Sequence, residues 1–172
     1  MKQFFAALGL LLVSGCTFQS NQLNALRAMW DKPSRSEVTW LATYGNDKAS
    51  VITVNHEPFI VFVNSNDVAI AFDGWQVRSV VGFGLTQPLK IDYEAGSPRF
   101  SGRKSVEEGV YKHRCDPWQY KATQVGGKWL QRCKADFYYD NVIVLDKEGA
   151  IVQISQVVDG SGTRVILEKL NG

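Results

Sequence analysis

The sequence predicts an all-β protein, an antiparallel β-sandwich or barrel-like domain with one short helix near its N-terminal end. Beyond Ser36 the chain consists of short runs of β-branched and aromatic residues. Turn-forming residues separate these runs at spacings of roughly 8–12 residues. Helical periodicity is nearly absent from the same region. Short strands with frequent turns are typical of antiparallel sandwiches and barrels.

The N-terminal end has the pattern of a bacterial lipoprotein signal. Lys2 is followed by an uncharged stretch over residues 4–13, and then by two small residues and Cys16. A membrane-spanning helix needs about 20 apolar residues, so the shorter stretch is interpreted as the hydrophobic region of a signal peptide. Cleavage before Cys16 would leave its thiol to carry a diacylglycerol and its amine to carry an acyl chain such as palmitate. A buried helix that ends in a core cysteine is the alternative.

This pattern divides the chain into a signal peptide (1–15), a lipidated tether (16–22) and a single β-rich domain (23–172). The lipid at Cys16 would attach the protein to a membrane, because several acyl chains, at about 0.8 kcal/mol per buried CH2, hold firmly. Thr17 stands where lipoproteins retained in the inner membrane usually have Asp. We therefore expect an outer-membrane protein, lipid-anchored on the periplasmic face. No other stretch is long and apolar enough to cross a membrane.

The domain is predicted to begin with a helix and to continue as strands. Apolar residues recur at helical spacing over 23–30, and Pro33 ends the helix because proline cannot continue it. The predicted strands follow in order: 38–44, 50–55, 58–64, 67–72, 75–83, 118–125, 128–139, 141–145, 150–158 and 163–170.

Four turns and one loop connect these strands. Asp73 and Gly74 are the strongest hairpin signal, since both residues tolerate the positive φ of a type I′ turn. Gly126-Gly127, residues 146–149 and residues 159–162 mark the later turns. The stretch 94–111 is rich in glycine and charge, and predicts a long loop.

Cys115 and Cys133 form an even pair in a protein expected to be exported. A disulfide is therefore the first interpretation, because the periplasm is oxidising. Strand alternation places Cys133 on the apolar face together with Trp129, which also favours a buried disulfide. A metal or redox site is the alternative, with His113 nearby, although no CxxC spacing occurs.

The chain carries little catalytic chemistry, and we expect no enzyme activity, cofactor or metal. It lacks the GxSxG, HExxH, P-loop and GxGxxG patterns. His56 and His113 are expected at the surface. Asp136 and Asp140 flank aromatic residues, as the carboxylates of a glycoside hydrolase do. The simpler interpretation places Asp136 on the solvent face and Asp140 at the start of a turn. The formal net charge is only +2 with charges interspersed, so nucleic-acid binding is not expected.

Aromatic residues are the best candidates for a binding surface. Exposed rings can stack on sugars, and concave apolar faces can hold acyl chains. Large aromatic side chains in β-proteins also fill cores, and the sequence leaves both roles open. The candidates for glycan stacking are Trp75, Trp118, Trp129 and Tyr138.

The C-terminal stretch 137–170 resembles the YjbF/GfcB-type lipoproteins of exopolysaccharide and group-four capsule operons. The signal, the helix and the segment 67–85 follow the same order as in that family, although the region 84–111 is reduced. The Cys115/Cys133 pair is not part of the resemblance. The matching features fall on residues Phe137–Tyr139, Asp146, Gly149, Gln153, Ser155, Gln156, Gly160 and Gly162.

The resemblance implies an accessory outer-membrane lipoprotein that assists capsule or exopolysaccharide export or assembly by binding polysaccharide or export proteins. It supplies no catalytic residues. A lipid or lipoprotein carrier is the second hypothesis, and a hydrolase inhibitor that presents the loop between Cys115 and Cys133 is the third. The carrier would line an acyl cavity with residues such as Leu41, Ile52, Ile60, Phe62 and Ile70.

Overall fold

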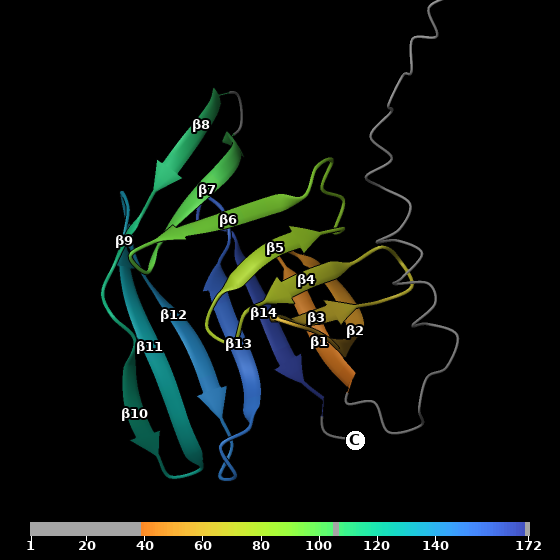
Figure 1. Ribbon diagram of the computed structural model, residues 1–172, viewed down its shortest axis with the longest axis vertical. Coiled ribbons are helices and arrows are strands. Elements are labelled where there is room, and N and C mark those ends of the chain that lie inside the picture. The colour runs from red at the N-terminus through yellow and green to blue at the C-terminus, as the bar shows by residue number, and fades with distance from the viewer. Residues whose placement is uncertain (1–38, 105–106, 171–172) are drawn as a thin grey trace, which may run out of the picture. The chain divides into compact units, whose positions relative to one another are not determined.

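A computed structural model describes residues 39–104 and 107–170, which form one curled antiparallel sheet without any helix (Figure 1). The all-β class is therefore confirmed for this part of the chain. The predicted signal peptide, the lipidated Cys16 and the helix over 23–30 lie outside the described residues. The strands are β1 (Thr39–Tyr44), β2 (Asp47–His56), β3 (Phe59–Val63), β4 (Ala69–Phe72), β5 (Val77–Val81), β6 (Leu89–Glu94), β7 (Ser97–Lys104), β8 (Glu107–Lys112), β9 (Arg114–Cys115), β10 (Gln119–Thr123), β11 (Gly126–Lys134), β12 (Tyr138–Leu145), β13 (Ile151–Val157) and β14 (Arg164–Lys169).

The sheet consists of two series of hairpins that are joined by one long-range strand pairing. β14 pairs with β1, so the order runs β10-β11-β12-β13-β14-β1-β2-β3-β4-β5-β6-β7-β8, and β9 pairs with β11. Figure 1 shows the sheet curling so that β4, β5 and β6 lie across the face of β13 and β14. The two halves of one sheet thus face each other, in the manner of a half-barrel.

The core fills the space between these two halves. Strand alternation directs Trp40 and Ala42 of β1, and Ile70 and Phe72 of β4, to the buried face. The Trp40 ring packs edge-on against Phe62, with centroids 5.1 Å apart. The buried side also contains Val51, Val77, Val80, Ile91, Phe100, Ile143, Ile154, Val165 and Leu167.

Buried amide side chains join the two halves. Gln156 of β13 is fully buried, and its Oε1 accepts a 3.0 Å hydrogen bond from Val77 N, at the start of β5. Its Nε2 donates a 2.7 Å bond to Trp75 O, in the preceding turn. One side chain therefore satisfies two backbone groups of the facing half, which would otherwise be buried without partners.

A second set of amides extends this connection towards β7. Val157 N donates to Asn141 Oδ1, and Asn141 Nδ2 donates to Gln131 Oε1. Gln131 Nε2 then donates a 3.1 Å bond to Gly96 O in the β6–β7 turn. We call Gln131, Asn141 and Gln156, with their backbone partners in the facing half, the amide seam.

Several local predictions are wrong. The stretch 94–111 is not a long loop, because β7 and β8 form a hairpin within it. The turn after β4 spans residues 73–76 and not Asp73-Gly74 alone, so Trp75 lies in a turn. β11 ends at Lys134, and β12 already begins at Tyr138. The predicted turns at 146–149 and 159–162 are confirmed.

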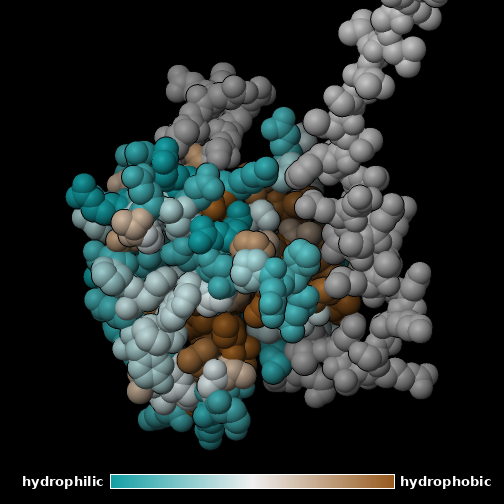
Figure 2. All heavy atoms as spheres, in the orientation of Figure 1, coloured by the Kyte–Doolittle hydropathy of each residue, from teal (hydrophilic) through white to brown (hydrophobic). Residues whose placement is uncertain are grey.

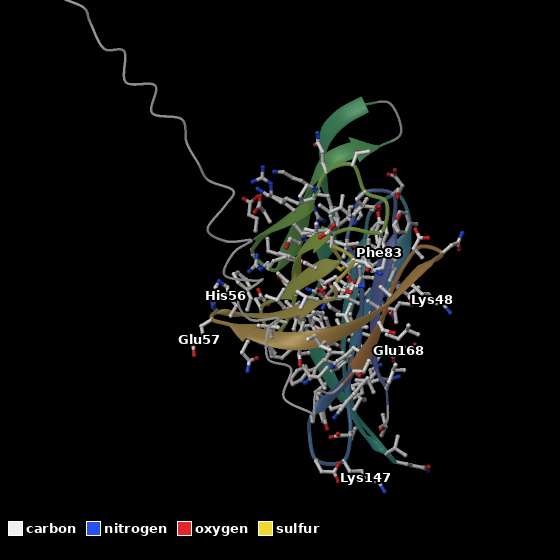
Figure 3. All side chains as sticks on the ribbon, turned by 90° about the vertical axis from the view of Figure 1, so that its right-hand side faces the viewer. Lys48, His56, Glu57, Phe83, Lys147 and Glu168 are labelled. Carbon is white, nitrogen blue, oxygen red and sulfur yellow. A yellow bond between two sulfur atoms is a disulfide. The ribbon has the colours of Figure 1, made fainter. Side chains whose placement is uncertain are left out.

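The two histidines differ in environment. His56 ends β2 and is exposed, as predicted, beside Glu57 at one end of the sheet (Figure 3). His113 is buried, which contradicts its expected surface position. Its Nδ1 lies 2.7 Å from Tyr139 Oη, and its ring packs edge-on against Phe100 with centroids 4.8 Å apart. It lies where the chain crosses from β8 to β9, between the two halves.

The carrier hypothesis placed five residues on one concave face, and this grouping is wrong. The register pairs Phe62 with Ile70, both buried. Leu41 is followed by buried Ala42 and preceded by buried Trp40, so it points to the other face. Ile52 lies beside buried Val51 in the same way, whereas Ile60 shares the face of Phe62.

The amide seam predicts a large loss of stability for Gln156→Leu. Leucine has a similar size but leaves Val77 N and Trp75 O buried without partners, and each lost partner costs about 1–3 kcal/mol. We expect the free energy of unfolding to fall by about 2–5 kcal/mol, measured by urea denaturation.

Gln153→Leu is the matched control, because Gln153 lies on the same strand and bonds Glu168 at the exposed surface. Its effect should stay within about 0.5 kcal/mol, as for most surface changes. Equal stabilities of the two variants would show that the amide seam does not hold the halves together.

Candidate functional site

Three of the four predicted stacking aromatics come together in the structure. Trp75 lies with its ring centroid 5.0 Å from that of Trp129 and 5.9 Å from that of Trp118. Tyr120 extends the cluster, 5.2 Å from Trp129. These residues come from the β4–β5 turn, from the segment after β9, and from β10 and β11. We call Trp75, Trp118, Trp129 and Tyr120 the aromatic cluster.

The β4–β5 turn holds Trp75 at the surface. Asp73 Oδ1 accepts hydrogen bonds from the backbone N–H groups of Trp75 and Gln76, at 2.9 and 2.7 Å. Gly74 has a φ of 97°, which glycine adopts without strain. Since Gln156 also binds Trp75 O, the backbone of this residue is fixed on both sides. Its side chain is 44% exposed.

The predicted disulfide between Cys115 and Cys133 is present and precedes Trp118. It joins β9 to β11, where the two cysteines are directly paired. Cys115 N also donates to Ser97 Oγ, and Asp116 N donates to Arg132 O. These bonds anchor the segment that carries Trp118. Within the described residues, Trp118 Nε1 is buried without a hydrogen-bond partner, so packing alone orients this ring.

A glycine allows Tyr120 to join the cluster. Tyr120 is paired with Trp129 across β10 and β11, and Gly127 lies diagonally beside it. A Cβ atom at Gly127 would overlap the Tyr120 ring. The missing side chain therefore leaves the space in which the tyrosine ring lies against the sheet.

The aromatic cluster borders a groove of about 620 Å³, open to solvent. Volumes of about 300–1,000 Å³ are usual for sites that bind one small ligand. Ile143 of β12 is paired with Trp129. Figure 2 shows a hydrophobic patch in the lower middle of the face viewed. The groove is lined by Pro58, Asp73, Trp75, Gln76, Trp118 and Trp129.

The charges around the groove are paired. Asp73 Oδ2 lies 2.6 Å from Arg78 Nε. The Arg78 guanidinium in turn lies over the Tyr93 ring, 4.8 Å from its centroid. Burial raises the pKa of Tyr93, and its hydroxyl donates to Val77 O. This phenol therefore remains a neutral donor, and it supports the start of β5 and not the groove itself.

Tyr138, the fourth predicted stacking residue, does not belong to this cluster. It is 69% exposed, and Lys134 Nζ lies 5.2 Å from its ring centroid. Tyr138 follows the β11–β12 turn, whereas the aromatic cluster includes Trp129 nearer the other end of β11. Strand alternation also puts it on the face opposite buried Tyr139.

The two carboxylates considered as a catalytic pair, Asp136 and Asp140, lie in different local structures. Asp136 is exposed in the β11–β12 turn, as the simpler interpretation predicted. Asp140 does not begin a turn but lies within β12, where its Oδ1 is 3.3 Å from Arg132 Nε. Strand alternation places Asp140 on the same face as Tyr138.

Two further alternatives concern the segment between the cysteines and a metal site. Most of the residues between Cys115 and Cys133 form β10 and β11, which pair as a hairpin and are not the loop expected for an inhibitor. Within residues 39–104 and 107–170, no group of three or more His, Cys, Asp or Glu residues is arranged to hold a metal ion. The same ranges contain no helix that could span a membrane.

The sequence did not identify Tyr120, Pro58 or Gln76 as neighbours of the tryptophans. Tyr120 had one detectable signal, because it is an aromatic residue shortly before the Gly126-Gly127 pair, although these glycines begin β11 and the turn itself lies at residues 124–125. Pro58 and Gln76 had none, since the β2–β3 and β4–β5 turns meet the β9–β11 region only when the sheet curls.

The fold and groove define a single-sheet, all-β domain with a solvent-open groove lined by aromatic residues. Among solved structures, the chain is similar to the crystal structure of YmcC, a hypothetical lipoprotein of Escherichia coli K12. The TM-score is 0.56 at 9% identity, and the match covers 90% of this chain and 97% of that one. The similarity establishes a shared fold. No family model matches the sequence, and no curated protein does.

We expect the disulfide to stabilise the folded protein and to help position the tryptophans of the aromatic cluster. Replacing Cys115 and Cys133 by serine should lower the free energy of unfolding by about 2–4 kcal/mol, since a closed loop of about 15 residues corresponds to about 3 kcal/mol. The near-ultraviolet circular dichroism of the tryptophans should weaken as well, because the segment before Trp118 loses an anchor.

Cys16→Ser is the matched control, since it removes a cysteine outside the disulfide. It should leave the unfolding midpoint and the tryptophan signal unchanged. An unchanged midpoint in the double serine variant would contradict a stabilising role for the disulfide.

Proposed function

We propose that this protein is a lipoprotein of the outer membrane that binds a glycan in the aromatic groove and thereby assists capsule or exopolysaccharide export or assembly. The observation that carries the proposal is the convergence of Trp75, Trp118 and Trp129 at one solvent-open groove. It acts by binding and not by catalysis.

Aromatic faces suit sugars for a physical reason. A pyranose ring presents C–H groups on its faces and hydroxyl groups on its rim, so an exposed indole can cover the apolar face while the rim stays hydrated. Trp75 keeps nearly half of its surface exposed although it lies in a well-ordered turn. Keeping a large ring exposed in a fixed position reduces the entropy lost on ligand binding.

The membrane role rests on the N-terminal signal pattern and Cys16. The similar fold of a protein described as a hypothetical lipoprotein supports this part of the proposal. The role in polysaccharide export rests on the resemblance of residues 137–170 to the YjbF/GfcB-type family, with polysaccharide or export proteins as partners. Thr17 supports the outer membrane as the destination.

The anchor can be tested without knowledge of the ligand. Cys16→Ala should remove the protein from the outer-membrane fraction, because the lipid attachment site is lost. Palmitate labelling of the cell should mark the wild-type protein and not the variant. Cys115→Ser is the control, and it should keep both the label and the membrane location. A labelled Cys16→Ala protein would refute the assignment.

Glycan binding can be tested with Trp75→Ala. Purified surface polysaccharide from the host strain should quench the tryptophan fluorescence of the wild-type protein. The variant should bind about tenfold more weakly. Stacking of a nucleic-acid base on one aromatic ring contributes about 1–3 kcal/mol, and we expect a similar loss for a sugar ring.

Tyr138→Ala is the matched control, because it removes an exposed aromatic ring away from the groove. Its affinity should equal that of the wild type. Equal loss in both variants, or quenching that persists in Trp75→Ala, would place binding elsewhere on the protein.

A further inference from the structure

We propose that the aromatic groove takes a single uncharged sugar ring, at a chain end or side branch, and not an extended run of an acidic polysaccharide. This inference rests on the proposed glycan-binding function. It names the class of ligand that the same site accepts. Ring geometry, charge pairing and the few available polar groups argue for it separately.

The ring geometry limits the length of the ligand. An extended chain that stacks on several aromatic rings needs faces that lie side by side in nearly one plane. Here the planes of Trp75 and Trp129 meet at 83°, and those of Trp75 and Trp118 at 45°. The planes of Tyr120 and Trp129 meet at 57°. The aromatic cluster is therefore an angled corner and not a platform.

The spacing of the rings supports the same conclusion. Centroid distances of 5.0–5.9 Å mean that neighbouring rings are already in contact. No sugar can enter between them, so a ligand must lie against the outer faces that the cluster leaves open. Trp75 supplies one such face, and the adjoining rings act as walls. A corner of this kind accommodates one ring.

The charge distribution favours a neutral ligand. Asp73 is the charged residue among those that line the groove, and both of its carboxylate oxygens are already engaged. Oδ1 accepts two backbone N–H groups, and Oδ2 is paired with Arg78 at 2.6 Å. The Arg78 guanidinium is held against Asp73 and the Tyr93 ring, and Arg78 is not among the residues that line the groove. The lining offers no unpaired cation among the described residues.

Gln76 is the one amide side chain among the residues that line the groove, and it can orient the sugar. Gln76 lines the groove, and its Nε2 makes only a 3.5 Å bond with Gly96 O. Its Oε1 accepts no hydrogen bond from the described residues, so it can accept one from a sugar hydroxyl. A single neutral acceptor beside stacked rings is a suitable arrangement for one sugar unit with few directional contacts.

The experiment uses the full lipidated protein in detergent and measures tryptophan fluorescence and calorimetric binding. The first set of probes is a panel of methyl hexopyranosides, glucuronic acid and sialic acid. The second set is a series of neutral oligosaccharides from disaccharide to hexasaccharide, which carries the best monosaccharide at its end. Each titration is repeated at low and at high salt.

We expect a neutral hexopyranoside to bind, with a Kd that changes less than about twofold along the oligosaccharide series and between the two salt conditions, since exposed charges are screened by salt and neutral stacking is not. Gln76→Leu should weaken binding by about three- to tenfold, as expected for the loss of one neutral hydrogen bond. Tyr138→Ala should leave the affinity unchanged.

The outcomes separate this inference from the function on which it rests. Tighter binding of the acidic sugars, or an affinity that rises with every added unit, would overturn the single neutral ring and leave glycan binding in place. If no sugar binds while the surface polysaccharide still quenches Trp75, the single-ring inference fails alone. If neither sugar nor polysaccharide binds, the proposed function fails too.

Discussion

The buried amide seam is the constraint on which the rest of this structure depends. The two halves of this single sheet are far apart in the strand order. Hydrogen bonds between neighbouring strands therefore do not by themselves bring the two halves face to face. Gln156 reaches across the interior to Val77 N and Trp75 O, and Gln131 reaches Gly96 O. Apolar packing drives the halves together without fixing their register, whereas these directional bonds select one register.

The seam also explains where the aromatic cluster lies. Trp75 belongs to the facing half, and Trp118 and Trp129 belong to the half that contains β9 and β11. The backbone of Trp75 is the acceptor of the shortest bond made by Gln156. The same interaction that closes the sheet therefore places one ring of the groove against the other two. On the other side, the Cys115–Cys133 disulfide fixes the segment that leads to Trp118.

The sequence predicted those features that depend on local pattern. The β-class, most strands, the disulfide and three of the tryptophans that line the groove followed from alternation, turn residues and composition. It failed where contacts between distant segments decide the outcome. His113 is buried because β8 crosses to β9 between the two halves. The β7–β8 hairpin forms although its residues carry weak strand propensity, since each strand pairs with a neighbour already in place.

Three residues that carry the resemblance to the YjbF/GfcB-type lipoproteins, Ser155, Gln156 and Gly162, have structural tasks in this chain. Gln156 belongs to the amide seam, and Ser155 accepts hydrogen bonds from Arg164 through its backbone oxygen and its Oγ. A Cβ at Gly162 would meet the Phe137 ring, so this glycine is needed for packing. None of these residues lines the groove. These residues support the fold of the sheet, and the similarity to the YmcC structure at 9% identity concerns that fold.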